Sequence, residues 1–107
     1  MNETSLFARR LSWDDARAFE NAEVGFYLLD EGSALLQAML VVSVTERPAV
    51  PGAQQFSIVF RGPRSPAFPQ QTYRVRHPVL GDYAIMVTPI RQTADATDYE
   101  ACFAHVA

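Results

Sequence analysis

The sequence has no lysine, one cysteine and no long apolar run, and each absence excludes a class of protein. A single thiol, Cys102, cannot form an internal disulfide, so we do not expect a disulfide-stapled secreted domain and we expect a reducing, cytoplasmic location. No run approaches the roughly 18 apolar residues that span a bilayer. Residues 1–5 lack the basic start of a secretion signal. We therefore expect no membrane association.

The balance of charged and apolar residues narrows the class further. The 107 residues carry a net charge of -3, with 49% hydrophobic and 20% charged residues, which is the composition of a folded chain. This length suits a single domain, 1–107, in which residues 1–11 form a loosely ordered N-terminal arm. All nine cationic residues are arginines. The slightly acidic balance does not favour nucleic-acid binding.

A short helix is predicted near the N-terminus, and strands are predicted after it. Ser12 suits the N-cap of a helix over residues 13–19, and Asp14 and Asp15 complement the positive end of the helix dipole. From residue 23 onward, apolar residues alternate with a period of two between turn signals. This pattern predicts six strands, at 24–29, 35–45, 56–60, 72–76, 83–88 and 99–103. Their short connections indicate antiparallel pairing, so we expect a mainly β fold, a compact antiparallel barrel or sandwich with one short N-terminal helix.

Several segments carry more specific structural expectations. Residues 35–42 are apolar on both faces, so the helix, another sheet or a partner must cover the second face. The proline-rich segment 61–69 is expected to form a stiff loop outside the sheet. Pro89 is expected to end its strand or to lie at an edge. Residues 77–81 suit a bulged hairpin turn in which His77 bonds nearby backbone, and residues 105–107 are expected to fray.

The sequence contains no constellation of catalytic, cofactor-binding or metal-binding residues. Cys102 is interpreted as a small half-buried apolar residue rather than a nucleophile, because no electropositive neighbour flanks it. His77 and His105 show no recognised metal-ligand spacing. The five glycines are dispersed and form no phosphate-binding motif. We therefore expect no enzymatic activity, no cofactor and no metal.

One stretch of arginines is the constellation of interest. Residues 61–76 hold four arginines and no acid, a local charge of +4, whereas residues 14–31 hold six acids and one arginine, a local charge of -5. Such blocks can steer contacts with a partner or between copies of the chain. If the fold places them side by side, they cancel within one subunit. The candidate interaction surface consists of Arg61, Arg64, Phe68, Arg74 and Arg76.

Three interpretations of this surface stay open. The arginines can form a solvated outer face, or they can bind an anionic protein partner. They can also bind single-stranded nucleic acid, as small β-barrels do with arginines and aromatic rings. In that case two or more aromatic rings must be exposed, whereas Tyr73 is predicted to face inward.

Four short motifs occur in order along the chain. They are FRGP at residues 60–63, QxTYR at 70–74, HPxLG at 77–81 and YEAxF at 99–103. With these motifs the chain resembles an uncharacterised family of small bacterial β-rich proteins, a domain of unknown function, from about residue 13 to residue 103. It departs from the family pattern at Gln71, where glycine is expected. The resemblance implies a small β domain and brings no activity, and similar proteins accompany phage-tail-like assemblies.

The leading hypothesis is a non-catalytic protein-interaction or assembly module of a bacterial cell or phage-tail-like system. The expected partner is a protein, either an acidic partner or further copies of the chain in a homo-oligomer. The alternative is a small-ligand or carbohydrate-binding β-barrel whose mouth is lined by tyrosines, although a tyrosine with a polar tip is also a common core residue. The tyrosines concerned are Tyr27, Tyr73, Tyr83 and Tyr99. Binding of single-stranded nucleic acid ranks third.

Overall fold

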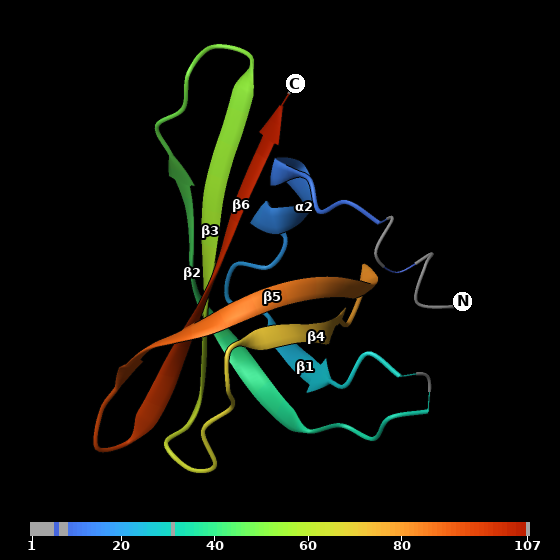
Figure 1. Ribbon diagram of the computed structural model, residues 1–107, viewed down its shortest axis with the longest axis vertical. Helices are drawn as coiled ribbons and strands as arrows, with labels where there is room; N and C mark the ends of the chain where they lie inside the picture. The colour runs from blue at the N-terminus through green and yellow to red at the C-terminus, as the bar shows by residue number, and fades with distance from the viewer. Residues whose placement is uncertain (1–5, 7–8, 31, 107) are drawn as a thin grey trace.

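The chain folds into a closed antiparallel β-barrel. The structure, a computed structural model, describes residue 6, residues 9–30 and residues 32–106. Its strands follow the order β1-β2-β3-β6-β5-β4 around the barrel (Figure 1). The mainly β prediction is confirmed, and of the two expected architectures the barrel is the one observed. The elements are α2 (Trp13–Arg17), β1 (Glu23–Tyr27), β2 (Gln37–Arg47), β3 (Ala53–Pro63), β4 (Gln71–His77), β5 (Gly81–Gln92) and β6 (Ala96–Val106).

The barrel closes along only part of its longest strands. β1 pairs with β2 only at residues 37–40 of β2, and β5 pairs with β6 only at residues 97–100 of β6. Beyond these points β2, β3 and β6 continue together as a three-stranded extension, which rises to the top of Figure 1 while β4 and β5 cross below it. The strands therefore diverge above the closed part of the barrel.

The core consists mainly of the inward side chains of all six strands, joined by Leu11, Ala16 and Phe19. The apolar core residues of the strands alternate with a period of two, and on the outer side Ser57 and Asp98 are buried as well. Phe68 covers the lower end of this core, where its backbone N–H donates to the Tyr99 hydroxyl at 2.9 Å. The largest fully buried side chains are Tyr73, Tyr83, Tyr99, Phe19, Phe26, Phe56, Phe60, Met39, Ile58, Ile85, Val41 and Val75.

Helix α2 packs against β2 and β3 near the upper end of the core (Figure 1). The prediction of Ser12 as N-cap is confirmed, because its Oγ accepts a hydrogen bond from the Asp15 backbone N–H at 3.1 Å. A helix of five residues is not stable alone, and buried side chains hold it in place. Phe19 is fully buried after the helix, and its ring lies 4.8 Å from that of His77.

The turn at residues 77–81 is fastened to the helix by His77. The Nε2–H of this buried side chain donates to the carbonyl of Ala18 at 3.1 Å. Its Nδ1 accepts the backbone N–H groups of Val79 and Leu80, both at 3.0 Å. Gly81 closes the turn with a φ of 86°, in the left-handed region that glycine favours. The predicted bonding of His77 to nearby backbone is thus confirmed.

Several predicted strand boundaries are wrong. The second strand begins at Gln37 rather than near residue 35, and a bulge between Val41 and Ser43 shifts its inward face by one residue. β3 runs to Pro63, so the expected loop at 61–69 is shorter than predicted. β5 passes Pro89 through a register shift and ends at Gln92, since a bulge is a position where a strand tolerates proline.

The C-terminal residues are paired rather than frayed as far as the structure describes them. β6 extends through His105, whose Nε2–H donates to the Leu11 carbonyl at 2.8 Å. Residues 1–5, 7 and 8 of the predicted N-terminal arm, Glu31 of the predicted turn and Ala107 lie outside the described residues. In the described part of the arm, Leu6 and Leu11 are buried. A search of the described residues finds no helix with the length and apolar character needed to cross a membrane.

Candidate interaction surface

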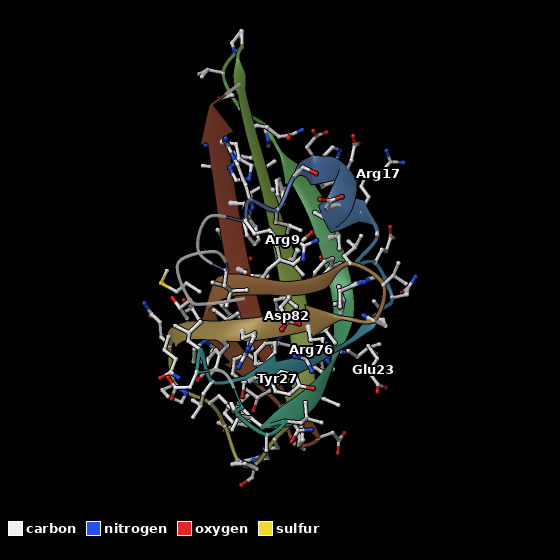
Figure 2. All side chains as sticks on the ribbon, turned by 90° about the vertical axis from the view of Figure 1, so that its right-hand side faces the viewer. Arg9, Arg17, Glu23, Tyr27, Arg76 and Asp82 are labelled. Carbon is white, nitrogen blue, oxygen red and sulfur yellow. The ribbon has the colours of Figure 1, made fainter. Side chains whose placement is uncertain are left out.

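Arg76 on β4 is the most firmly held of the candidate arginines. Its Nε and Nη2 donate to the two carboxylate oxygens of Asp82 at 2.7 and 3.0 Å. Its guanidinium also lies over the Tyr27 ring, 4.5 Å from the ring centre. Figure 2 shows Arg76, Tyr27 and Asp82 grouped on one side of the barrel. The hydrogen bonds from Arg76 lower the pKa of Asp82 below its ordinary value, against the opposing effect of partial burial.

Two further arginines surround the same carboxylate. Arg74 donates to the backbone carbonyl of Asp30, and its Nε lies 4.0 Å from an oxygen of Asp82. That separation is too long for a hydrogen bond, and the buried Nε has no other partner among the described residues. Arg9 donates to the backbone carbonyl of Asp82 at 3.1 Å. Two guanidinium groups, those of Arg74 and Arg76, therefore face the Asp82 carboxylate, and Arg9 bonds the backbone of the same residue.

Apolar residues adjoin these arginines on the outer side of β1. Gly25 pairs with Arg76 on one side and with Ala38 on the other. A Cβ at Gly25 would lie 2.8 Å from both Leu35 Cδ1 and Tyr27 Cε1, so the absence of a side chain lets these two residues cover the strand. Leu35 and Leu40 are 51% and 47% exposed. We call this surface the β1 face and define it by Tyr27, Leu35, Leu40, Arg74 and Arg76.

Arg61 belongs to a second arginine cluster. It donates to both carboxylate oxygens of Asp98 at 2.8 and 3.0 Å, and Arg91 donates to the same carboxylate at 3.1 and 3.2 Å. Asp98 is only 2% exposed, although it lies on the outer side of β6. The hydrogen bonds from Arg61, with a smaller contribution from Arg91, lower the pKa of Asp98. This cluster fastens β3 and β5 to β6.

Arg64 and Phe68 are engaged in loop packing. Arg64 donates to the Thr93 carbonyl at 3.2 Å, which ties the β3–β4 loop to the β5–β6 turn. Phe68 is half-buried, and its ring makes edge or tilted contacts with Tyr73 and Tyr99. Both residues therefore stabilise the lower end of the barrel in this structure.

The predicted surface is thus divided between separate places. Arg74 and Arg76 lie together on the β1 face, whereas Arg61 lies on β3, and strands β1 and β2 stand between β3 and β4. Arg61 still borders the β1 face, since it pairs with Leu40 across β2 and β3. Leu35 and Leu40 belong to the apolar segment 35–42 whose second face was expected to be covered, and Tyr27 was expected to line the barrel mouth; the sequence did not predict that these three residues adjoin the arginines. The sequence signal that could have indicated them is Gly25, where two apolar residues can approach the backbone.

The two blocks of opposite charge lie side by side, because β1 pairs with β4. The ion pairs of the basic block, however, are made with Asp82 and Asp98 from the C-terminal part of the chain. Much of the local +4 is therefore neutralised within the subunit. Arg74 and Arg76 remain together around Asp82 on the β1 face, where the exposed Glu23 pairs with Leu40.

Three of the four tyrosines fill the interior of the barrel. Tyr73, Tyr83 and Tyr99 are fully buried, and the Tyr73 hydroxyl donates to the Pro69 carbonyl at 2.8 Å. Burial raises the pKa of Tyr73, and the nearby Tyr99 adds to the effect. Tyr27 instead lies on the outer surface. A filled interior counts against a ligand site in the barrel mouth.

The remaining candidate groups show no converging chemistry in the part of the chain that the structure describes. Cys102 is exposed on the outer side of β6 rather than half-buried; partial desolvation of its thiol, together with the Glu100 carboxylate, raises its pKa. A raised pKa disfavours the reactive thiolate. His77 and His105 are both bonded to backbone carbonyls. No group of three metal-binding side chains occurs within the described residues.

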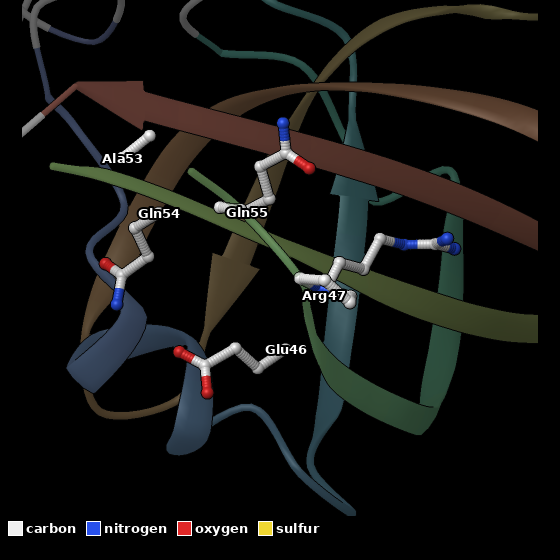
Figure 3. Close-up of a pocket in the computed structure, with 7 residues that line it drawn as sticks. Glu46, Arg47, Ala53, Gln54 and Gln55 are labelled. Carbon is white, nitrogen blue, oxygen red and sulfur yellow. The ribbon is translucent and has the colours of Figure 1, made fainter. Parts of the chain in front are cut away.

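A cleft of about 400 Å³ opens at the β2–β3 hairpin (Figure 3). It is lined by Glu46, Arg47, Gln54 and Gln55 among others. The Arg47 side chain extends away from Glu46 and Gln54, and it donates to Glu100 at 3.2 Å. The cleft therefore offers one carboxylate and two amides without a converging cation.

Comparison with known proteins places the chain in a family. A family model for the domain of unknown function DUF6916 matches residues 11–103. The chain belongs to this family. Neither a curated protein nor a solved structure matches the chain. The resemblance to an uncharacterised domain family is confirmed, and DUF6916 membership adds no activity or ligand to what the geometry offers.

Proposed function

We propose that the protein is a non-catalytic interaction module that binds an acidic protein partner through the β1 face. The observation that carries the proposal is Arg76, which is held between the Asp82 carboxylate and the Tyr27 ring beside an exposed leucine, Leu35. Arginine and aromatic residues around an apolar centre are the composition of protein-interaction hot spots.

The way Arg76 is held favours binding. Asp82 occupies the Nε and Nη2 side of the guanidinium, and the side chain is half exposed. Arginine has five N–H donors, so the end of the group keeps donors for a carboxylate of a partner. Because its conformation is already fixed, less side-chain entropy is lost on binding. These free guanidinium donors make a carboxylate of an acidic segment the favoured partner.

Apolar residues supply the second half of this surface. Eight large apolar side chains are exposed among the described residues, and four of them lie between residues 28 and 40, at Leu28, Leu35, Leu36 and Leu40. Their concentration on one hairpin supports a binding surface rather than scattered exposure. The motif resemblance supports a more specific proposal about the partner. We propose that it belongs to an assembly of the bacterial cytoplasm or of a phage-tail-like system.

Site-directed photo-crosslinking in the native host tests the proposal. A photoreactive residue at Leu35 should capture a partner whose cross-linked peptide is acidic, while one at Val50, on the β2–β3 hairpin, should not. Arg76→Glu should abolish the cross-link. Arg91→Glu is the matched control, since Arg91 also bonds a carboxylate but lies off the β1 face. Equal capture with Arg76→Glu and the wild type would contradict the proposal.

A further inference from the structure

The upper half of β6 has an edge that pairs with no strand of the described chain. β6 pairs with β3 along its whole length, but β5 leaves it at the pair Thr88–Glu100. Above that pair, no other backbone hydrogen bond reaches residues 101–105 from the described residues. We call residues 101–105 the β6 edge. The N–H and C=O groups along such an edge are a template for another strand.

The opposite edge of the three-stranded extension is protected. The outer edge of β2 is also unpaired above Val41, but it contains a bulge, carries Glu46 and Arg47, and is followed by Pro48. Bulges, charges and proline are the devices that prevent an edge from pairing. The β6 edge, Ala-Cys-Phe-Ala-His, has no Asp, Glu, Lys or Arg, no proline and no register shift against β3. The fold therefore blocks one edge and leaves the backbone of the other unpaired, while Arg10 and the Leu11 carbonyl bond the His105 ring at its upper end.

A groove lies beside the open edge. It has a volume of about 340 Å³ and is bounded by Phe103 and His105 of β6, by residues 83–85 of β5 and by residues 9–11. An added strand would direct alternate side chains toward this inner side of the sheet. The groove offers room for those side chains, so a strand at the edge gains packing as well as backbone hydrogen bonds.

We propose that a second copy of this chain supplies the added strand. Its β6 edge would pair antiparallel with the first across a two-fold axis and join the two extensions into one six-stranded sheet. The residues of this edge carry no carboxylate or guanidinium, so self-pairing brings no like charges directly opposite each other. An isologous contact uses the open edge of both copies. The protected β2 edges then stop the assembly at a dimer.

The dimer is independent of the proposed function, because the β1 face and the β6 edge use different strands. It also responds differently to salt. Screening weakens a contact between Arg76 and an acidic partner. The β6 edge instead adjoins Arg9 and Arg10 at the groove, so screening should leave the dimer unchanged or strengthen it. Failure of one proposal therefore leaves the other standing.

Sedimentation and light scattering over a wide concentration range provide the test. The wild type should form a dimer, and Ala104→Lys should weaken it at least tenfold, since a lysine on an edge opposes pairing. Gln55→Lys is the matched control, because Gln55 pairs directly with Ala104 on the central strand. It should dimerise like the wild type. A wild type that stays monomeric, or equal dimerisation of Ala104→Lys, would overturn the proposal.

Hydrogen exchange of the wild-type protein gives a second measurement that needs no variant. Within residues 101–105, the amides that point away from β3 should become more protected as concentration rises, while the upper β2 edge stays unchanged. Protection that is independent of concentration at both edges would also overturn the dimer. Arg76→Glu should leave the dimer intact, and Ala104→Lys should leave the Leu35 cross-link intact.

Discussion

Replacing Gly62 with alanine should destabilise the barrel by overfilling its core. A Cβ at this position would lie 2.4 Å from Met39 Sδ and 3.0 Å from Met39 Cε, and Met39 is only 1% exposed. Non-bonded heavy atoms prefer separations of about 3.5–4.0 Å, so the buried thioether must move by about 1 Å. Overpacking of this kind costs about 1–3 kcal/mol. Because the 2.4 Å contact is with a buried atom, we take the upper part of that range, about 2–3 kcal/mol. Alanine is intrinsically favoured over glycine in a strand by about 0.5–1 kcal/mol, so we expect a net loss of about 1–2.5 kcal/mol.

Urea unfolding followed by the fluorescence of Trp13 measures this loss. Trp13 is the sole tryptophan, and its ring lies 5.5 Å from that of Phe56. Met39→Ala alone should cost about 2–5 kcal/mol. The double variant Met39→Ala/Gly62→Ala should lose less stability than the sum of the two single losses, by about 0.5–3 kcal/mol, because the new methyl group then occupies the space that the Met39 side chain vacates. Unchanged stability of Gly62→Ala, or strict additivity of the pair, would refute the reasoning.

Three further predictions concern titration and a buried hydrogen-bond centre. The Asp98 carboxyl has a folded pKa below its ordinary 3.8, so its stabilising effect is fully present above that value and is lost as the pH falls through the folded pKa. Urea midpoints measured below about pH 4 should therefore depend less steeply on pH in Asp98→Asn than in the wild type. His77→Phe keeps a ring beside Phe19 but leaves three backbone groups without their partner, namely the Ala18 carbonyl and the N–H groups of residues 79 and 80. It should therefore lower the free energy of unfolding by about 1–3 kcal/mol and speed hydrogen exchange around residue 79. Alkylation of Cys102 should be slow at neutral pH for an exposed thiol, and Glu100→Gln should accelerate it, because removal of the carboxylate lowers the thiol pKa.

Local sequence signals predicted the parts of the fold that depend on nearby residues. Ser12 caps its helix because the bond it accepts comes from three residues away. The turn at 77–81 follows from a proline and a glycine within five residues. The bulges at Val42 and near Pro89 escaped prediction, because they are set by the register of a neighbouring strand.

The candidate surface was only partly predictable for the same reason. Alternation along β4 correctly directed Arg74 and Arg76 outward. The ion-pair partners of the arginines depend on strand order. Arg61 is bound by Asp98, and Arg76 is bound by Asp82 rather than by an acid of the 14–31 block. Tyr27 lies outside because it alternates with the buried Val24 and Phe26, and the missing side chain of Gly25 lets its ring lie against the strand, a contact that the alternation alone does not predict.

The order of strands around the barrel also has a consequence for folding. β1, β2 and β3 form one meander and β4, β5 and β6 another, each built from hairpins between successive strands. Only two ladders join the two meanders, β3–β6 and β1–β4. In the β1–β4 ladder Gly25 pairs with Arg76. Loop-closure entropy is lost mainly in these two distant pairings. We therefore expect the docking of two preformed halves to limit the folding rate, so that substitutions in these ladders slow folding while substitutions confined to a hairpin mainly speed unfolding.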